Sequence, residues 1–173
     1  MGVFCEMLSE DMLRANFRNS KKVLMITCPG CACESLSYTE GFPCRSLEQG
    51  KDMVHSAIAV HRVRDKWDSI LTEMNVQVSH VTVMFPCEMF DTDRDLILNK
   101  IYGNDTIAVL ACFSGHAAIK NMLSDFGGKI VLMMKTTGLF VFRLVPDETG
   151  KNSIVDQNTA KIVHFSDVTK PLR

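Results

Sequence analysis

The sequence lacks the features that would place the chain in a membrane, on nucleic acid or on a nucleotide. No apolar run approaches the ~18–20 residues of a membrane-spanning helix, so we predict no membrane span. Lysine and arginine number 19 against 20 aspartate and glutamate, and the resulting net charge of -1 provides no electrostatic basis for binding nucleic acid. Neither a G-x-G-x-x-G turn nor a Walker lysine is present, so the motifs of dinucleotide and nucleoside triphosphate sites are missing.

The N-terminal residues also lack the basic region and long apolar core of a secretory signal. We therefore expect a cytoplasmic protein. Thiols stay reduced in that compartment, so closely spaced cysteines there favour metal ligands or redox centres over structural disulfides.

What the chain does contain is an alternation of short apolar runs with segments of helical periodicity. Helices are expected at 9–19, 51–75, 91–101 and 116–126, and strands at 23–27, 76–85, 106–111, 130–134 and 139–145. Repeated strand–helix–strand units imply right-handed crossovers and parallel pairing. We therefore predict an α/β fold with a single doubly wound, mostly parallel sheet, Rossmann-like or flavodoxin-like in its three layers, and helices on both faces.

The length favours one domain over residues 1–173. It would comprise the N-terminal helix 9–19, a core at about 20–145 and a C-terminal extension at 146–173. The stretch 34–50 contains Gly41, Pro43 and Gly50 and is expected to be a loop or a broken helix.

Five of the seven cysteines stand directly after expected strands. The carboxyl ends of parallel strands share one edge of the sheet, where open α/β folds place ligands. We therefore expect thiols that are scattered over ninety residues of sequence to meet at this edge. They are Cys28, Cys31, Cys33, Cys87 and Cys112.

The run Cys28-Pro-Gly-Cys31-Ala-Cys33 is the most specific signal. A C-x-x-C pair lets two thiolates reach one metal site, because Gly30 permits a tight turn. We expect Cys33 to be a third ligand and either Cys112 or Cys87 to be the fourth. Cys112 is preferred because it opens a helix, whose N-terminal dipole stabilises a thiolate. Four cysteine ligands suit an iron–sulfur cluster, our preferred cofactor, or zinc.

The same residues also allow two other functions. A C-x-x-C pair at a helix start is typical of thiol–disulfide oxidoreductases, which would use Cys28 and Cys31. The segment around Gly115 and His116 opens a predicted helix and favours a non-catalytic small-anion site.

The remaining candidates have weaker signals. His116 is either a metal ligand, a proton shuttle or an ordinary first-turn residue. Thr137 follows a strand and is expected to line the same edge. Cys5 and Cys44 are expected to be buried small residues or surface thiols.

These motifs together resemble the N-terminal, Rossmann-like portion of the MetV-type small subunit that partners methylenetetrahydrofolate reductase in anaerobic one-carbon metabolism. The resemblance covers roughly residues 20–145. No cysteine follows Cys112, so that family's cysteine-rich C-terminal module has no counterpart here. The matching positions are Cys28, Cys31 and Cys33 in the first turn, Cys112 and Gly115 in the second, and Thr137, Gly138 and Leu139 in the third.

The resemblance implies a thiolate-ligated cluster or zinc site in a protein that passes electrons to another subunit. It also supports Cys112 as the fourth ligand. We therefore predict an accessory metal- or iron–sulfur-binding protein linked to electron transfer, with a redox or reductase subunit as its partner.

Overall fold

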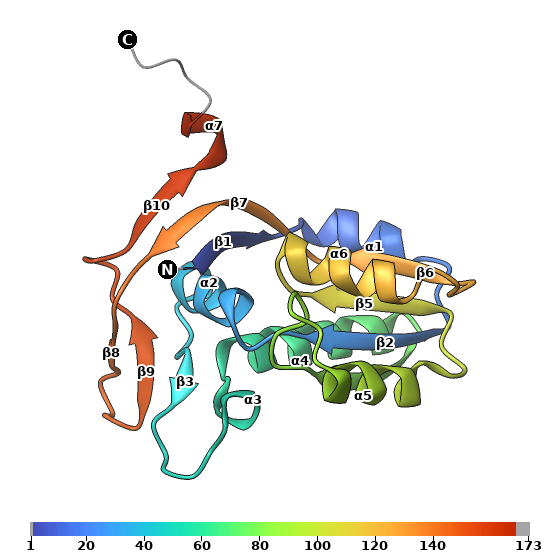
Figure 1. Ribbon diagram of the computed structural model, residues 1–173, viewed down its shortest axis with the longest axis horizontal. Coiled ribbons are helices and arrows are strands. Elements are labelled where there is room, and N and C mark those ends of the chain that lie inside the picture. The colour runs from blue at the N-terminus through green and yellow to red at the C-terminus, as the bar shows by residue number, and fades with distance from the viewer. Residues whose placement is uncertain (1, 169–173) are drawn as a thin grey trace.

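The most apolar runs of the chain form the centre of a four-stranded parallel sheet. In the computed structural model, which describes residues 2–168, β2 (Lys22–Thr27) and β5 (Thr106–Leu110) lie side by side (Figure 1). Strand β4 (Gln77–Thr82) pairs with β2, and β6 (Lys129–Leu132) pairs with β5. Both central strands are buried almost throughout, as expected of parallel strands that are covered on both faces.

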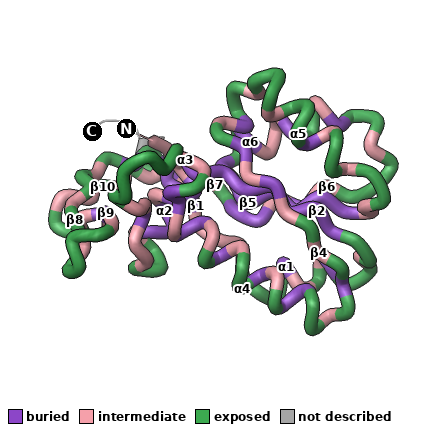
Figure 2. The backbone as a smooth tube through the Cα atoms, turned by 90° about the horizontal axis from the view of Figure 1, so that it is seen from below, coloured by how far each residue is buried: buried purple, intermediate pink, exposed green. Residues whose placement is uncertain are grey.

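Helices cover both faces of this sheet. Figure 2 shows α1 (Glu10–Phe17) and α4 (Ala59–Glu73) on one side, and α5 (Asp91–Ile101) and α6 (Phe113–Met122) on the other. The expected N-terminal helix is α1, and its N-cap is Ser9, whose hydroxyl accepts a hydrogen bond from the Met12 amide at 3.3 Å. No helix within residues 2–168 has both the length and the apolar character that crossing a membrane requires.

The other strands within residues 2–168 form two antiparallel sheets of three strands each. One has the order β1-β7-β10 and contains β1 (Gly2–Met7), β7 (Met134–Val141) and β10 (Lys161–His164). The other has the order β3-β9-β8 and contains β3 (Arg45–Ser46), β9 (Asn152–Val155) and β8 (Leu144–Pro146). The short helix α7 (Phe165–Val168) follows β10.

The prediction of a single, mostly parallel sheet is therefore wrong. A parallel neighbour needs a crossover of a dozen or more residues, whereas only Met133 separates β6 from β7. Buried and exposed residues alternate along much of β7, as is typical of an antiparallel strand with one solvated face. The lack of a helical segment between 134 and 139 was the signal in the sequence for this change of sheet.

The prediction of a loop or broken helix at 34–50 is also wrong in its first part. Helix α2 (Cys31–Glu40) follows the cysteine-rich turn directly, with Gly30 as N-cap. It ends at Gly41, whose φ of 71° lies in the left-handed region that glycine adopts without strain. The expected helix 51–75 is divided into α3 (Met53–Ser56) and α4.

A second, smaller core holds the antiparallel strands against α2. Its aromatic centre is Phe140 on β7, whose ring centroid lies 5.2 Å from that of Phe4 and 5.3 Å from that of Tyr38. Strand β1 also bonds to α2 directly, because the Cys5 amide donates to the Ser35 hydroxyl at 3.0 Å. These contacts bring the start of the chain to the carboxyl edge of the parallel sheet.

Candidate thiol-rich site

The strand order creates a switch point between β2 and β5. The chain leaves β2 for β4 on one side of the sheet and leaves β5 for β6 on the other. Open α/β sheets bind ligands where strand order reverses in this way, outside the carboxyl ends of the strands. Cys28 follows β2 at this point, and Cys112 follows β5 as the N-cap of α6. The Cys28 amide donates to the Leu110 carbonyl at 3.1 Å, which ties the two loops together.

Cys31 is the first residue of α2 and lies against the N-terminal strand. Its thiol is half-buried; burial raises its pKa, and the nearby Val3 backbone opposes this increase. A Cβ added at Gly2 would lie only 3.2 Å from the Cys31 sulfur, so glycine allows the close approach of β1. The structure thus places a helix start directly after the Cys28-Pro-Gly-Cys31 turn.

Cys87 comes from the loop that follows β4 and is exposed. The Cys28 thiol donates to the Met84 carbonyl of this loop at 3.8 Å. Pro86 packs on Gly115 of α6, where an added Cβ would lie 3.0 Å from the Pro86 Cγ. The lack of a side chain at Gly115 therefore seats the Cys87 loop against the helix that Cys112 opens.

Cys5 is a member of this group that the sequence did not indicate. It lies on β1 with no exposed surface, and its sulfur is 3.5 Å from the Thr136 hydroxyl on β7. It reaches the edge through strand pairing between residues more than 130 positions apart, for which its sequence neighbourhood carries no signal. We name the five residues of this group the edge thiols: Cys5, Cys28, Cys31, Cys87 and Cys112.

The edge thiols influence one another electrostatically. Burial is the largest cause that raises the pKa of Cys28 to about 12, and the negative charges of Cys112, Cys31 and Cys87 raise it further. Burial likewise raises the pKa of Cys5 to about 12 and raises the pKa of Cys31 and of Cys87. A charge on Cys112 contributes to the increase in all four cases. Cys112 is thus the common neighbour of the other four.

The chemistry of these donors suits a thiophilic metal centre, but their spacing does not suit a single ion. Within residues 2–168 no three His, Cys, Asp or Glu side chains lie close enough together to hold one metal ion. Thiolates that share a zinc ion each lie about 2.3 Å from it, which requires a tighter group. A cluster distributes its cysteine ligands over several irons and so accepts more widely spaced sulfurs.

Cys33 does not join the edge thiols. It lies two positions after Cys31 on α2, and residues with that spacing do not share a helix face. Its thiol donates to the Cys44 carbonyl at 3.1 Å. Both residues have no exposed surface. We name Cys33 and Cys44 the inner pair.

The inner pair has an electrostatic environment of its own. Hydrogen bonding to Cys44 is the largest cause that lowers the pKa of Cys33, aided by the backbone amides of Val60 and Ala59 and by the charge of Arg45. The Cys33 thiol and burial together raise the pKa of Cys44. The pair therefore differs from Cys5, Cys28, Cys31 and Cys87 in that hydrogen bonding outweighs burial at one of its sulfurs and lowers the pKa of that thiol.

Two of the remaining predicted site residues have structural surroundings. The ring of His116 packs beside Phe113, with centroids 6.4 Å apart, and partial burial followed by the charge of Lys120 lowers its pKa. Thr137 is the extra residue at the irregularity between β1 and β7, and its buried hydroxyl has no hydrogen-bond partner in the described structure.

Thr136, the neighbour of Thr137, contacts the start of α6. The Thr136 hydroxyl accepts a hydrogen bond from the Phe113 amide at 2.9 Å. This contact occupies one of the amides that an anion at that helix end would use. It therefore counts against the anion-binding alternative.

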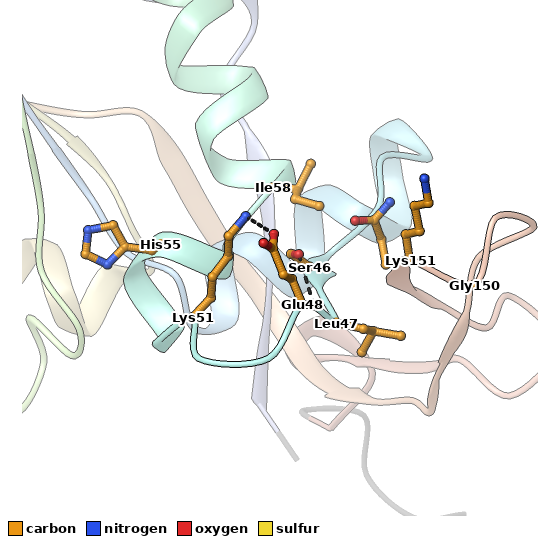
Figure 3. A pocket seen from close by; sticks show the side chains of 9 residues that line it. Ser46, Leu47, Glu48, Lys51, His55, Ile58, Gly150 and Lys151 are labelled. Atoms are coloured by element: carbon orange, nitrogen blue, oxygen red, sulfur yellow. Dashed lines mark hydrogen bonds and ion pairs between the residues drawn. The ribbon is translucent and has the colours of Figure 1, made fainter.

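One cavity has no cysteine among its lining residues, although Ile58 at its wall donates its amide to the Cys44 carbonyl. It has a volume of about 570 Å³ and opens between the segment after β3 and the turn between β8 and β9 (Figure 3). Lys51 and Glu48 form an ion pair of 2.7 Å at this cavity. Its lining residues are Ser46, Leu47, Glu48, Lys51, His55, Ile58, Gly150, Lys151 and Asn152.

No protein-family model, curated protein or solved structure matches this chain. The case for a function therefore depends on the residues and on their arrangement.

Proposed function

We propose that the protein binds an iron–sulfur cluster through Cys28, Cys31, Cys87 and Cys112 and passes electrons to a partner protein. The observation that carries the proposal is the convergence of four thiols from three separate loops at the switch point of the parallel sheet. This ligand set replaces Cys33 of the sequence-based set with Cys87, because Cys33 is occupied by Cys44.

Two features favour a cluster over zinc. The first is the absence of a histidine from the donor set, although four sulfurs also occur around zinc, so the spacing of the sulfurs carries more weight. Their spacing in the described structure is too wide for one ion, whereas ligands on several irons stand farther apart. When bound, such a cluster supplies one-electron transfer.

The protein contributes the positions of the sulfurs and access to them. Loops from three strands hold the sulfurs, and Cys112 is the N-cap of α6. Cys87 is exposed, and Phe113, next to Cys112, is 59 % exposed. A partner can therefore approach the site closely, which electron transfer needs. We include in this proposal a cytoplasmic location and a reductase partner of the kind that the MetV-type resemblance implies.

Thiol–disulfide exchange by Cys28 and Cys31 is the second candidate. It is favoured by the position of Cys31 at the first residue of α2, since a helix N-terminus stabilises a thiolate. Against it, burial raises the pKa of both thiols, and a protonated thiol is a poor nucleophile.

The experiment is anaerobic reconstitution of the purified, reduced protein with ferrous iron and sulfide, followed by iron, sulfide and zinc analysis. We expect bound iron and sulfide with broad visible absorption, and we expect Cys31→Ser to lose both. Cys44→Ser is the matched control and should retain them, because Cys44 lies outside the proposed ligand set. A wild-type protein that stays colourless and reduces a disulfide substrate would replace this proposal by the exchange function.

A further inference from the structure

The inner pair is a second thiol site with a separate chemistry. Cys33 and Cys44 are eleven positions apart in sequence, the Cys33 thiol donates to the Cys44 backbone carbonyl at 3.1 Å, and neither residue has exposed surface. Neither thiol contributes to the proposed cluster site. Two adjacent thiols in a buried position are the arrangement from which a disulfide forms without a large movement of the backbone.

The backbone holds Cys44 at this position from two sides. Its amide donates to the Ser153 carbonyl of β9 at 2.6 Å, and its carbonyl accepts from the Ile58 amide at 2.8 Å. The same carbonyl accepts the Cys33 thiol, so α2, β9 and the start of α4 meet at one residue. The contact is therefore a fixed feature of the fold.

An ion pair joins the two residues that follow Cys33 and Cys44 in the sequence. Glu34 follows Cys33 on α2 and Arg45 follows Cys44, and their charged groups are 3.1 Å apart. Arg45 also donates to the Pro29 carbonyl at 3.3 Å. The segments that carry the two thiols are thus joined at consecutive positions.

We propose that Cys33 and Cys44 form a reversible disulfide when the protein meets a peroxide. The Cys33 sulfur attacks hydrogen peroxide, the O–O bond breaks, and Cys33 becomes a sulfenic acid while one water leaves. The Cys44 sulfur then attacks the Cys33 sulfur, the S–S bond forms, the S–O bond breaks, and the Cys44 proton leaves with the hydroxide as a second water. The two thiols lose two electrons and two protons, and one peroxide becomes two waters.

The bond would connect the first turn of α2 to the segment that begins β3. Cys31, on the same turn, belongs to the edge site, so oxidation of the inner pair fixes the helix that presents it. Because both thiols have no exposed surface, the reaction needs a local opening and should be slower than oxidation of the exposed Cys87.

The test uses the full-length, reduced protein without added iron. Hydrogen peroxide is added, the reaction is stopped with acid, and remaining thiols are alkylated under denaturing conditions. Cleavage after glutamate separates a fragment 11–34, which contains Cys33, from a fragment 41–48, which contains Cys44. We expect a linked pair of these fragments, two hydrogens lighter than their sum, which a reducing agent separates.

Fragmentation of the linked pair in the mass spectrometer assigns the bond within 11–34. The cross-link should be retained in Cys28→Ser and Cys31→Ser and lost in Cys33→Ser. If Cys44 remains fully alkylated after the other thiols are oxidised, or if the bond maps to Cys28 or Cys31, the proposal is overturned. The result is independent of iron binding, so it stands or fails separately from the cluster.

Discussion

Helix α2 contributes one cysteine to each of two thiol environments, which differ in their hydrogen bonding and in the direction of their pKa shifts. On one side, burial raises the pKa of Cys5, Cys28, Cys31 and Cys87, and the charge of Cys112 raises it further. On the other side, the inner pair is hydrogen-bonded, and the Val60 amide is directed at Cys33. The comparison teaches that two cysteines two positions apart can belong to unrelated sites, because a helix directs them to different faces.

The largest expected effect is the loss of iron in Cys112→Ser. The charge of Cys112 acts on all four other edge thiols, so its sulfur is the most central of the group. We expect bound iron after reconstitution to fall at least about tenfold, since changes even beside a ligand cost about that much. Cys33→Ser, on the other side of α2, should keep its iron. Equal losses in the two variants would mean that the two environments are not separate.

The next largest effect concerns the ion pair between Arg45 and Glu34, beside the inner pair. In Arg45→Met, Glu34 loses its partner while its side chain is only 18 % exposed, and we expect a loss of about 2–3 kcal/mol in the free energy of unfolding. Burial already raises the pKa of Glu34, with Arg45 opposing the increase. The variant should therefore have a still higher Glu34 pKa in the folded state.

The sign of the pH dependence follows from this increase. A raised carboxyl pKa means that the folded state binds the proton more tightly, so the penalty is complete above the folded pKa and disappears below the unfolded pKa of about 4.3. Urea unfolding should show a larger defect for Arg45→Met at neutral pH than in mild acid. The double variant with Glu34→Gln should remove this pH dependence. A defect that is equal at all pH values would contradict the role of the Glu34 charge.

A smaller effect is expected at Gly115, where the lack of a side chain lets Pro86 of the Cys87 loop pack closely. In Gly115→Ala the new Cβ would lie 3.0 Å from Pro86 Cγ and 3.1 Å from Ala111 Cβ, so the Cys87 loop must shift. We expect a destabilisation of about 1–2 kcal/mol and weaker iron retention than in the wild type. Gly127→Ala is the control, because nothing lies within 4 Å of its added Cβ. An unchanged iron content in Gly115→Ala would show that the loop position does not matter.

The sequence predicted the parallel half of the molecule better than the antiparallel half. Strands β2 and β5 are buried on both faces, so their composition alone identifies them. Strand β1 is as long as β2, but only two of its six residues are buried, and its partner β7 lies far along the chain. Half of the residues of helix α2 are cysteine, serine or threonine, which are weak helix formers, and tertiary packing decides its structure.

The same reasoning explains the candidate site. Cysteines at strand ends predict a common edge, and in the structure the charges of Cys112, Cys31 and Cys87 act on Cys28. Cys33 was wrongly assigned to that edge. Its position depends on helix α2, which the sequence did not predict and which directs Cys33 towards Cys44. The contact of Cys33 with Cys44 depends on the path of the chain around Gly41, where spacing carries no information.

The smallest effect contrasts exposure with burial in the iron-free protein. Cys87 is exposed, so Cys87→Ser should change the free energy of unfolding by no more than about 0.5 kcal/mol. Cys33→Ala removes a fully buried sulfur and its hydrogen bond to the Cys44 carbonyl, and we expect a loss of about 1–2 kcal/mol. The Ile58 amide still satisfies that carbonyl, which keeps the loss moderate. Urea unfolding of the two reduced variants measures the difference, and a Cys87→Ser protein as unstable as Cys33→Ala would show that the Cys87 side chain is structural.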